Sequence, residues 1–335
     1  MIAFITFFFF LIVISFFVIY PGTKNEMGYF LDAKLRNELA GKIDFLMIGA
    51  SHGLTAFVPQ VIDKELGVNS YNISSPMMTT SSKYFLLNKE LKRNPVKTVV
   101  LEVSFDSLSR NEKKENAIGD ANTVHRADSF QEALMYLFKN VGFHDWLNVY
   151  ARIFMHGLSN TKDLLRHNKK NKIHYEDKGS HLLETIDISL SEKQCRKLAK
   201  TIKIKNIYNS ATFKRFCKIV DLCKQNNLHI IIVVVPISDN LICKIDDLDS
   251  FRVFLSDYCK EAKIEYYDFN LIKSRYSLFN DASSHHDLDH MSRSGAEIFS
   301  RLFSETLTKA SQGESTDSLF YKSYAEMEKD SPYSK

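Results

Sequence analysis

Two short motifs at opposite ends of the chain carry side chains that can cooperate in nucleophilic chemistry. The first is Gly49-Ala50-Ser51-His52-Gly53, after an apolar run, and the second is Asp287-Leu288-Asp289-His290, before a helical pattern. A serine hydroxyl is a poor nucleophile until an imidazole accepts its proton, and a carboxylate can orient that imidazole. The two motifs together therefore predict an esterase-like or acyl-transfer site.

We expect Ser51 to be the nucleophile, His290 the base and Asp287 the residue that orients the base. Asp287 lies three residues before His290 in a turn-like segment. At this spacing its carboxylate can reach Nδ1 of the imidazole while Nε2 faces the serine. The alternatives are that Ser51 is only a helix N-cap and that His290 is only a surface residue ahead of a helix.

Four further residues are candidates for stabilising an oxyanion or binding substrate: His52, Asn72, Ser75 and His286. His285 and His286 can each supply a spare base or a hydrogen bond to substrate, or belong to an exposed polar loop. Asp289 is adjacent to His290, and we expect it to point elsewhere.

The elements that must position these residues form an alternating α/β pattern. Strand-like runs lie at 44–49, 68–73, 98–103, 229–235 and 264–269, and helical patterns lie at about 57–66, 80–93, 211–226, 248–262 and 294–309. Such alternation predicts parallel strands, right-handed crossovers and a doubly wound, flavodoxin-like sheet. The continuous apolar run from Ile230 to Val235 is typical of a central strand buried on both faces.

Three parts can be distinguished along the chain. Residues 1–22 are expected to be a transmembrane anchor, because Ile2 to Tyr20 is uncharged and apolar and no A-x-A-like cleavage site follows, as a signal peptide would require. Residues 23–310 are expected to form the α/β domain, with a helical insertion at about 111–205. Residues 311–335 are polar and Ser-rich, which predicts a mobile tail.

Composition excludes some classes of function. With 44% apolar residues and a net charge of +4, the chain is neither wholly disordered nor basic enough to indicate a nucleic-acid partner. The basic segment 166–172 can contact an anionic polymer or lipid headgroups, or be a solvated loop. The five cysteines have no CxxC spacing, so we expect no metal site, and nothing indicates an organic cofactor.

The pattern Gly49-x-Ser51-x-Gly53 also matches the nucleophile elbow of α/β-hydrolases. In that fold the elbow comes after several strands, and the acid lies well before the histidine. Here the serine follows the first strand and the acid is three residues from the histidine, so we reject that identity.

This arrangement resembles the SGNH (GDSL-like) hydrolase superfamily. Within it, the arrangement resembles the membrane-anchored bacterial proteins that handle acyl groups on cell-surface polymers, such as the alginate acetylation and D-alanine transfer proteins. The resemblance is carried by residues 48–52, by the strand end Val233-Val234-Val235-Pro236, and by residues 287–296, where the family often shows D-x-x-H-L-N before a Gly-Ala helix start. It spans most of residues 43–310, apart from the insertion.

The resemblance implies a membrane-anchored serine esterase or O-acyltransferase that acts on acyl groups, O-acetyl first among them, of a cell-surface polysaccharide. It implies a single-pass anchor in the cytoplasmic membrane, contacting lipid through residues 2–20, with the catalytic domain outside. Lys24, Lys34 and Arg36 after the anchor favour the opposite orientation. The expected partners are an acylated polysaccharide or small acyl ester and envelope proteins that modify polysaccharides.

The family's two oxyanion donors, a glycine and an asparagine, have no clear counterpart in residues 72–76 and 104–106. Loss of one such donor costs roughly 10²- to 10³-fold in rate. The alternative function is therefore a catalytically inactive protein of the same fold that binds or assembles surface polysaccharide.

Overall fold

The computed structural model describes residues 34–105, 107–108, 117–141, 149, 177–185, 192–199, 207, 210–279 and 281–331. The anchor predicted at residues 1–22 and the basic segment 166–172 lie outside these residues. Among the described residues, no helix combines the length and the apolar character needed to cross a membrane.

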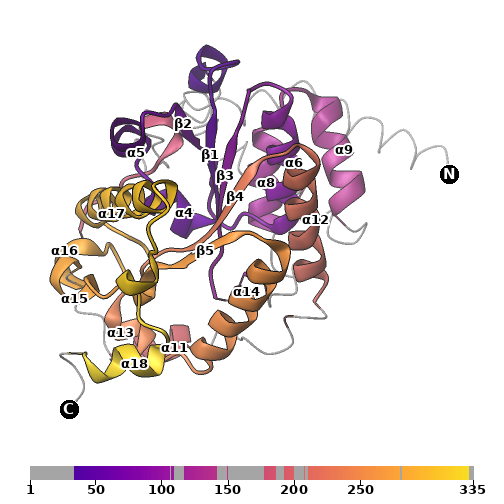
Figure 1. The fold of residues 1–335 in the computed structure, drawn as a ribbon. Helices are drawn as coiled ribbons and strands as arrows, with labels where there is room; N and C mark the ends of the chain where they lie inside the picture. The colour runs from indigo at the N-terminus through magenta and orange to yellow at the C-terminus, as the bar shows by residue number, and fades with distance from the viewer. Residues whose placement is uncertain are drawn as a thin grey trace.

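Five parallel strands form the centre of the molecule (Figure 1). They are β1 (Phe45–Ile48), β2 (Ser70–Asn72), β3 (Thr98–Glu102), β4 (His229–Val234) and β5 (Glu265–Asp268), in the order β2-β1-β3-β4-β5. This is the order of a flavodoxin-like sheet, so the predicted α/β class and sheet type are confirmed. In such a sheet the strand order reverses between β1 and β3, and ligands bind at the carboxyl ends of those strands.

Helices cover both faces of the sheet (Figure 1). One face carries α4 (Ser51–Ala56), α5 (Pro59–Leu66) and α17 (Arg293–Ser311), and the other carries α6 (Thr80–Leu91), α12 (Ala211–Gln225) and α14 (Leu248–Ala262). Ile231 and Val233 of β4 pack with Phe299 of α17, whereas Ile232 packs with Phe251 of α14. Because both faces are buried, β4 shows no alternation in its sequence.

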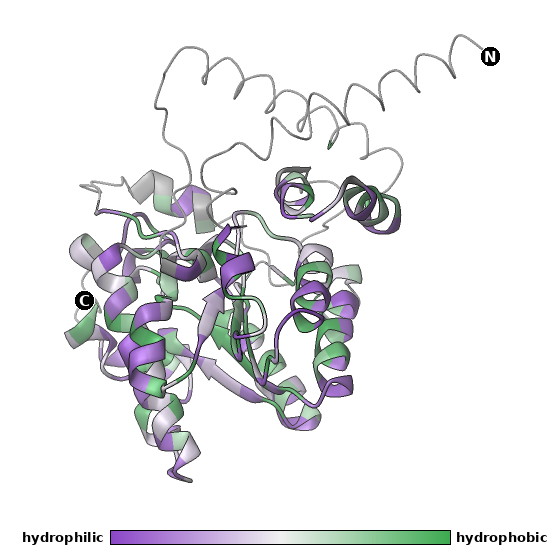
Figure 2. Ribbon diagram, turned by 90° about the horizontal axis from the view of Figure 1, so that it is seen from above, coloured by the Kyte–Doolittle hydropathy of each residue, from purple (hydrophilic) through white to green (hydrophobic). Residues whose placement is uncertain are grey.

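Hydrophobic and hydrophilic residues share the surface of each flanking helix (Figure 2). Shorter elements complete the described chain: α8 (Ala117–His125), α9 (Phe130–Asn140), η2 (Asp177–Gly179), α11 (Glu192–Ala199), α13 (Asp239–Ile242), η4 (Phe269–Leu271), α15 (Arg275–Leu278), α16 (Asp281–Ser284), η5 (Asp317–Leu319) and α18 (Tyr324–Lys329). The described parts of segment 111–205 include α8 and α9, which pack together in a small core around Tyr136. This pair contacts the sheet domain through α6.

Apolar and aromatic side chains between residues 319 and 327 pack against the domain, so the mobile tail that we predicted from residue 311 is wrong for this part. Tyr324 donates a hydrogen bond to Asp268 at 2.8 Å, and Met327 is 2% exposed. Asp249 of α14 accepts the backbone N–H groups of Tyr324 and Ala325. Composition alone indicates disorder here, because the segment is polar and Ser-rich. A few buried side chains and the hydrogen bonds from the first turn of α18 to Asp249 nevertheless order it.

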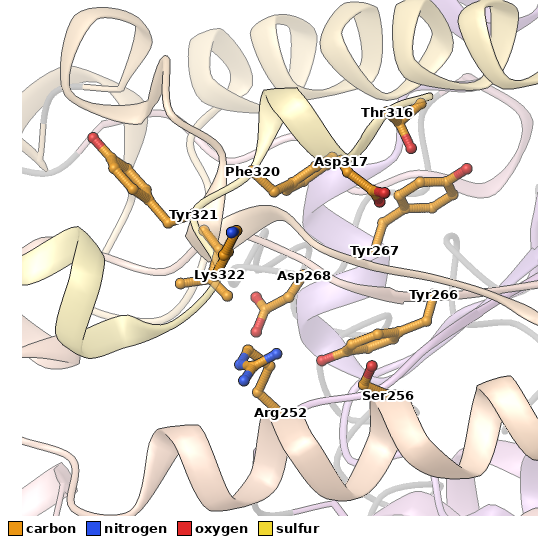
Figure 3. Close-up of a pocket in the computed structure, with 11 residues that line it drawn as sticks. Arg252, Ser256, Tyr266, Tyr267, Asp268, Thr316, Asp317, Phe320, Tyr321 and Lys322 are labelled. Carbon is orange, nitrogen blue, oxygen red and sulfur yellow. The ribbon is translucent and has the colours of Figure 1, made fainter. Parts of the chain in front are cut away.

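A cavity of about 310 Å³ lies between β5, α14 and this C-terminal segment (Figure 3). Arg252, Tyr266 and Phe320 are among its lining residues, as is Asp268 at the end of β5. Burial raises the pKa of Asp268 to about 6, although hydrogen bonds from Tyr324 and Asn270 oppose the shift. Neither motif singled out in the sequence contributes to its lining, so this cavity is distinct from the site described below.

We expect Met327→Ala to lower the free energy of unfolding by about 2 kcal/mol or more, because it removes a buried side chain. Urea-induced unfolding measures this loss. Met135→Ala is the matched control, since Met135 of α9 is 54% exposed and its truncation leaves the core intact. Equal stability of Met327→Ala and the wild type would mean that α18 does not pack on the domain in solution.

Candidate active site

The turn after β1 is shaped by a buried carboxylate at the end of β3. Glu102 is fully buried, and its Oε2 accepts the backbone N–H of Ala50 at 2.8 Å. A Cβ on Gly49 would lie 2.5 Å from this oxygen, and one on Gly53 would lie 3.2 Å from Cβ of Glu102. Glu102 therefore requires a glycine at position 49 and packs closely against Gly53.

Ser51 is the first residue of α4, and its hydroxyl is not used to cap the helix. The N-cap position is Ala50, and no side chain caps this end. The described residues offer no hydrogen-bond partner to Ser51 Oγ, whereas the Ser51 carbonyl accepts a bond from Thr55. The structure thus differs from the N-cap alternative and leaves the hydroxyl available for reaction.

Asp287 and His290 form the pair that their spacing predicts. Both carboxylate oxygens of Asp287 lie 2.9 Å from Nδ1 of His290. Oδ1 of Asp287 also accepts the backbone N–H groups of His290 at 2.7 Å and Asp289 at 3.1 Å. This turn fixes the proton on Nδ1 and leaves Nε2 as the nitrogen that can accept another.

The two motifs meet through His52. The ring centroids of His52 and His290 are 5.3 Å apart, and Nε2 of His52 lies 3.3 Å from Oδ2 of Asp289. Ser51 precedes His52 on the same helical turn, so the two motifs lie in one region of the molecule. The structure has no hydrogen bond between Ser51 Oγ and His290, a bond that in enzymes often tightens only when substrate is present.

We predicted that Asp289 points away from His290, and this prediction is wrong. Its carboxylate lies between the two histidines. Its Oδ1 is 3.3 Å from Nδ1 of His290, while its Oδ2 faces His52. Because Asp287 caps the following backbone, the chain turns sharply enough for the side chains of Asp289 and His290 to lie on the same side.

His52 was a candidate for binding substrate, but both of its ring nitrogens face carboxylates. Nδ1 lies 3.8 Å from Oε1 of Glu102. Glu102 is flanked in turn by Lys83 of α6, whose Nζ lies 3.9 Å from Oε2 and donates to the Glu102 backbone carbonyl at 2.8 Å. Lys83, Glu102, His52, Asp289 and His290 thus form a series of alternating charges, which we call the charge chain.

Neither Glu102 nor Lys83 was predicted from the sequence to be a site residue. One signal was available for Glu102, because a carboxylate inside the apolar run Thr98–Val103 is costly to bury without partners. Lys83 carried no such signal, since a lysine on a helical pattern is ordinarily solvated.

The charge chain changes the ionisation of both histidines. Burial lowers the pKa of each ring, but the carboxylates outweigh burial: Asp289 and Glu102 raise the pKa of His52 to about 10, and Asp287 and Asp289 raise that of His290 to about 9. Burial favours the neutral form of Glu102, yet Lys83 and His52 hold its pKa below the usual value.

Asn72 is poorly placed to stabilise an oxyanion, whereas Ser75 stays a candidate. The Asn72 amide donates to the carbonyls of Gly53 at 2.9 Å and Phe57 at 3.4 Å, which leaves it no hydrogen for a substrate. Its role is to hold α4 on β2, and it is removed as an oxyanion donor. The hydroxyls of Ser74 and Ser75 are buried without hydrogen-bond partners among the described residues.

The other two histidines of the loop differ from each other. His286 Nδ1 lies 2.5 Å from the carbonyl of Glu184, and its backbone N–H donates to the carbonyl of His290. His286 therefore ties the loop to segment 177–185. His285 is 1% exposed, so the exposed-loop alternative is wrong for this residue.

His52, Asp289 and His290 present donor atoms within 4.8 Å of one another, close enough for one metal ion. The same atoms already contact one another as hydrogen-bond and ion-pair partners. The arrangement is therefore complete as a set of charge pairs.

No protein-family model and no curated protein matches the sequence. Among solved structures, the chain is similar to a protein assigned to the G-D-S-L lipolytic family from Desulfitobacterium hafniense, with 11% identity, a TM-score of 0.38, and coverage of 78% of this chain and 98% of that one. The chain is also similar to an acylhydrolase structure from Bacteroides fragilis, with 12% identity, a TM-score of 0.38, and coverage of 86% of this chain and 97% of that one. The similarity to an acetyl xylan esterase from Butyrivibrio proteoclasticus has 8% identity, a TM-score of 0.31, and coverage of 82% of this chain and 64% of that one. At identities and TM-scores this low, conclusions on function must come from the site itself.

The raised pKa of His52 predicts that stability decreases in alkaline solution. The folded protein retains a proton that the unfolded chain loses near pKa 6.5, so the stabilisation is full below that pH and is lost as pH rises through about 10. Between about pH 7 and pH 10 we expect the free energy of unfolding to fall more in the wild type than in His52→Gln, by roughly 1–3 kcal/mol.

Urea-induced unfolding at the two pH values measures this difference. His229→Gln is the control, because its pair with Glu265 is half exposed and such pairs contribute little. Equal decreases in the wild type and His52→Gln would show that His52 is not charged in the folded protein.

Proposed function

We propose that this protein is a serine acyl hydrolase in which Ser51 attacks an ester carbonyl, His290 is the general base and Asp287 orients it. One observation carries the proposal. The Asp287–His290 pair, formed at 2.9 Å, lies with its ring 5.3 Å from His52, the residue that follows the uncapped serine. These positions support the proposal, because nucleophilic ester cleavage needs a nucleophile, a base and a group that orients the base.

The reaction follows from these positions. Nε2 of His290 accepts the proton of Ser51 as Oγ bonds to the carbonyl carbon, and Asp287 stabilises the resulting imidazolium. The imidazolium then returns that proton to the departing alcohol as the ester C–O bond breaks, which leaves an acyl-serine. Water attacking the acyl-serine completes hydrolysis, and a sugar hydroxyl in its place completes acyl transfer.

The backbone N–H of Ser51 is the donor that best fits the developing oxyanion. The first N–H groups of a helix have no acceptor within the helix, and Ser51 opens α4. A single donor of this kind contributes roughly 10²- to 10³-fold to the rate.

The proposed substrate class is an O-acyl group, with O-acetyl foremost, on a cell-surface polysaccharide. Support comes from the two sequence motifs and from the uncharged run at residues 2–20, which in this proposal anchors the domain on the outer side of the cytoplasmic membrane. Envelope proteins that modify polysaccharides are the proposed partners. Analysis of the acyl products distinguishes hydrolysis from transfer.

One observation favours the second candidate, an inactive protein of the same fold that binds or assembles polysaccharide. The amide of Asn72 is occupied by backbone carbonyls, so the site has fewer oxyanion donors than the resemblance implies. Turnover itself separates the two candidates.

We expect a fluorophosphonate probe to label the wild type and to fail with Ser51→Ala and His290→Ala, because the probe reacts only with an activated serine. Labelling is read by mass spectrometry of the intact protein. Ser277→Ala, at an exposed serine that hydrogen-bonds a backbone carbonyl, should be labelled normally. A well-folded wild type that remains unlabelled would favour the binding protein.

We expect kcat/KM for p-nitrophenyl acetate to rise with pH through a limb near pH 9. His290 must be neutral to accept the serine proton, and Asp287 and Asp289 raise its pKa to about 9 against the effect of burial. Asp287→Asn should lower kcat by roughly 10²- to 10⁴-fold. A rate independent of pH across this range would contradict the role of His290 as the base.

A further inference from the structure

We propose that Asp289 is a second carboxylate for His290 and that His52 is the positioning residue which holds it, so that the charge chain sets the basicity and orientation of the base. This inference rests on the proposed function. It extends the set of residues that act on His290 from the surface turn into the centre of the sheet.

Solvent exposure decreases from Asp287 through Asp289 and His52 to Glu102. The side chain of Asp287 is 39% exposed and that of Asp289 is 26% exposed, whereas His52 is 15% exposed and Glu102 is fully buried. Attraction to an exposed carboxylate is weakened by water and salt. Asp287 therefore provides the shortest contact with His290, and Asp289 connects the base to charges that are more strongly shielded from solvent.

The surroundings of His52 bear on its protonation. Nε2 faces Asp289 at 3.3 Å and Nδ1 faces Glu102 at 3.8 Å, so both ring nitrogens are directed at carboxylates. A neutral imidazole carries only one N–H and would direct a lone pair at one of these oxygens. Oε1 of Glu102 has no hydrogen-bond partner among the described residues, so a cationic His52 also compensates its charge. The geometry favours His52 as an imidazolium.

His52 and Asp289 connect two parts of the site, one of which is held in place by hydrogen bonds. His52 lies on α4, which Glu102 holds through the N–H of Ala50 and Asn72 holds through the carbonyl of Gly53. Asp289 belongs to the loop before α17. The bond between His52 and Asp289 therefore connects the turn that carries the nucleophile to the loop that carries the base.

Asp287 and Asp289 of its own loop contact His290, and the ring of His52 of α4 lies beside it. Beyond His52 lie Glu102 of β3 and Lys83 of α6. Their signs give opposite expectations for two variants. Asp289→Asn removes a negative charge beside His290 and leaves the cation of His52 nearby, so protonation of His290 becomes harder. His52→Gln removes that cation and leaves His290 as the remaining side-chain partner of Asp289 among the described residues, so protonation becomes easier.

NMR titration of the histidine rings in the full protein tests these signs without any need for activity. We expect the His290 midpoint to fall by about one pH unit or more in Asp289→Asn and to rise in His52→Gln. His229→Gln, at an exposed His–Glu pair on β4 and β5, should leave it unchanged. A His290 midpoint that does not move in Asp289→Asn, or moves in the same direction in both variants, would overturn the inference.

The activity profile supplies a second readout. The limb in kcat/KM should move with the NMR midpoint in each variant, and KM should change little, because neither side chain is expected to contact substrate. If His52→Gln does not fold, Asp289→Asn still decides the matter through its downward shift. Activity that survives Ser51→Ala would overturn the proposed function, whereas an essential Ser51 together with unmoved midpoints would overturn only this inference.

Discussion

The carboxylate of Glu102 is buried at the end of β3, where a charge is costly unless other groups compensate it. Its partners come from three elements: the N–H of Ala50 after β1, Lys83 of α6 and His52 of α4. The absence of a Cβ at Gly49 makes room for it. The position of the turn that carries Ser51 thus depends on satisfying one buried charge.

The sheet order explains why this charge lies where ligands can bind. β1 and β3 are adjacent and parallel, and the strand order reverses between them, so the turn after β1 and the end of β3 lie side by side. The loop that carries Asp287 and His290 reaches the same place because α17 packs on α4 and α5. Residues separated by more than half of the chain therefore share one site.

Compared with a minimal Ser-His-Asp site, this one has additional charges. His290 contacts two carboxylates rather than one, and a second imidazole lies beside it. An environment rich in carboxylates favours the protonated base, which reduces the fraction of His290 able to accept a proton at neutral pH. In the proposed reaction, the same environment stabilises the imidazolium that forms when Ser51 attacks. The balance between these effects depends on how much of the Asp289 charge is neutralised by His52.

The sequence by itself determined the fold class, because strand and helix periodicities are local properties and their alternation restricts the connections to parallel crossovers. It also determined the Asp287–His290 pair, since three residues of turn bring the two side chains together without distant contacts. Composition failed for residues 312–331, where Tyr324 and Met327 are buried against elements distant in sequence. The direction of Asp289 was predicted incorrectly, and the partners of Asn72 and His52 were not predicted, for a related reason: the direction of a polar side chain depends on which partner the fold brings near it. Only the tertiary structure could place Glu102 and Lys83 beside the first motif, because a buried charge is compensated in space and its partners need not be neighbours along the chain.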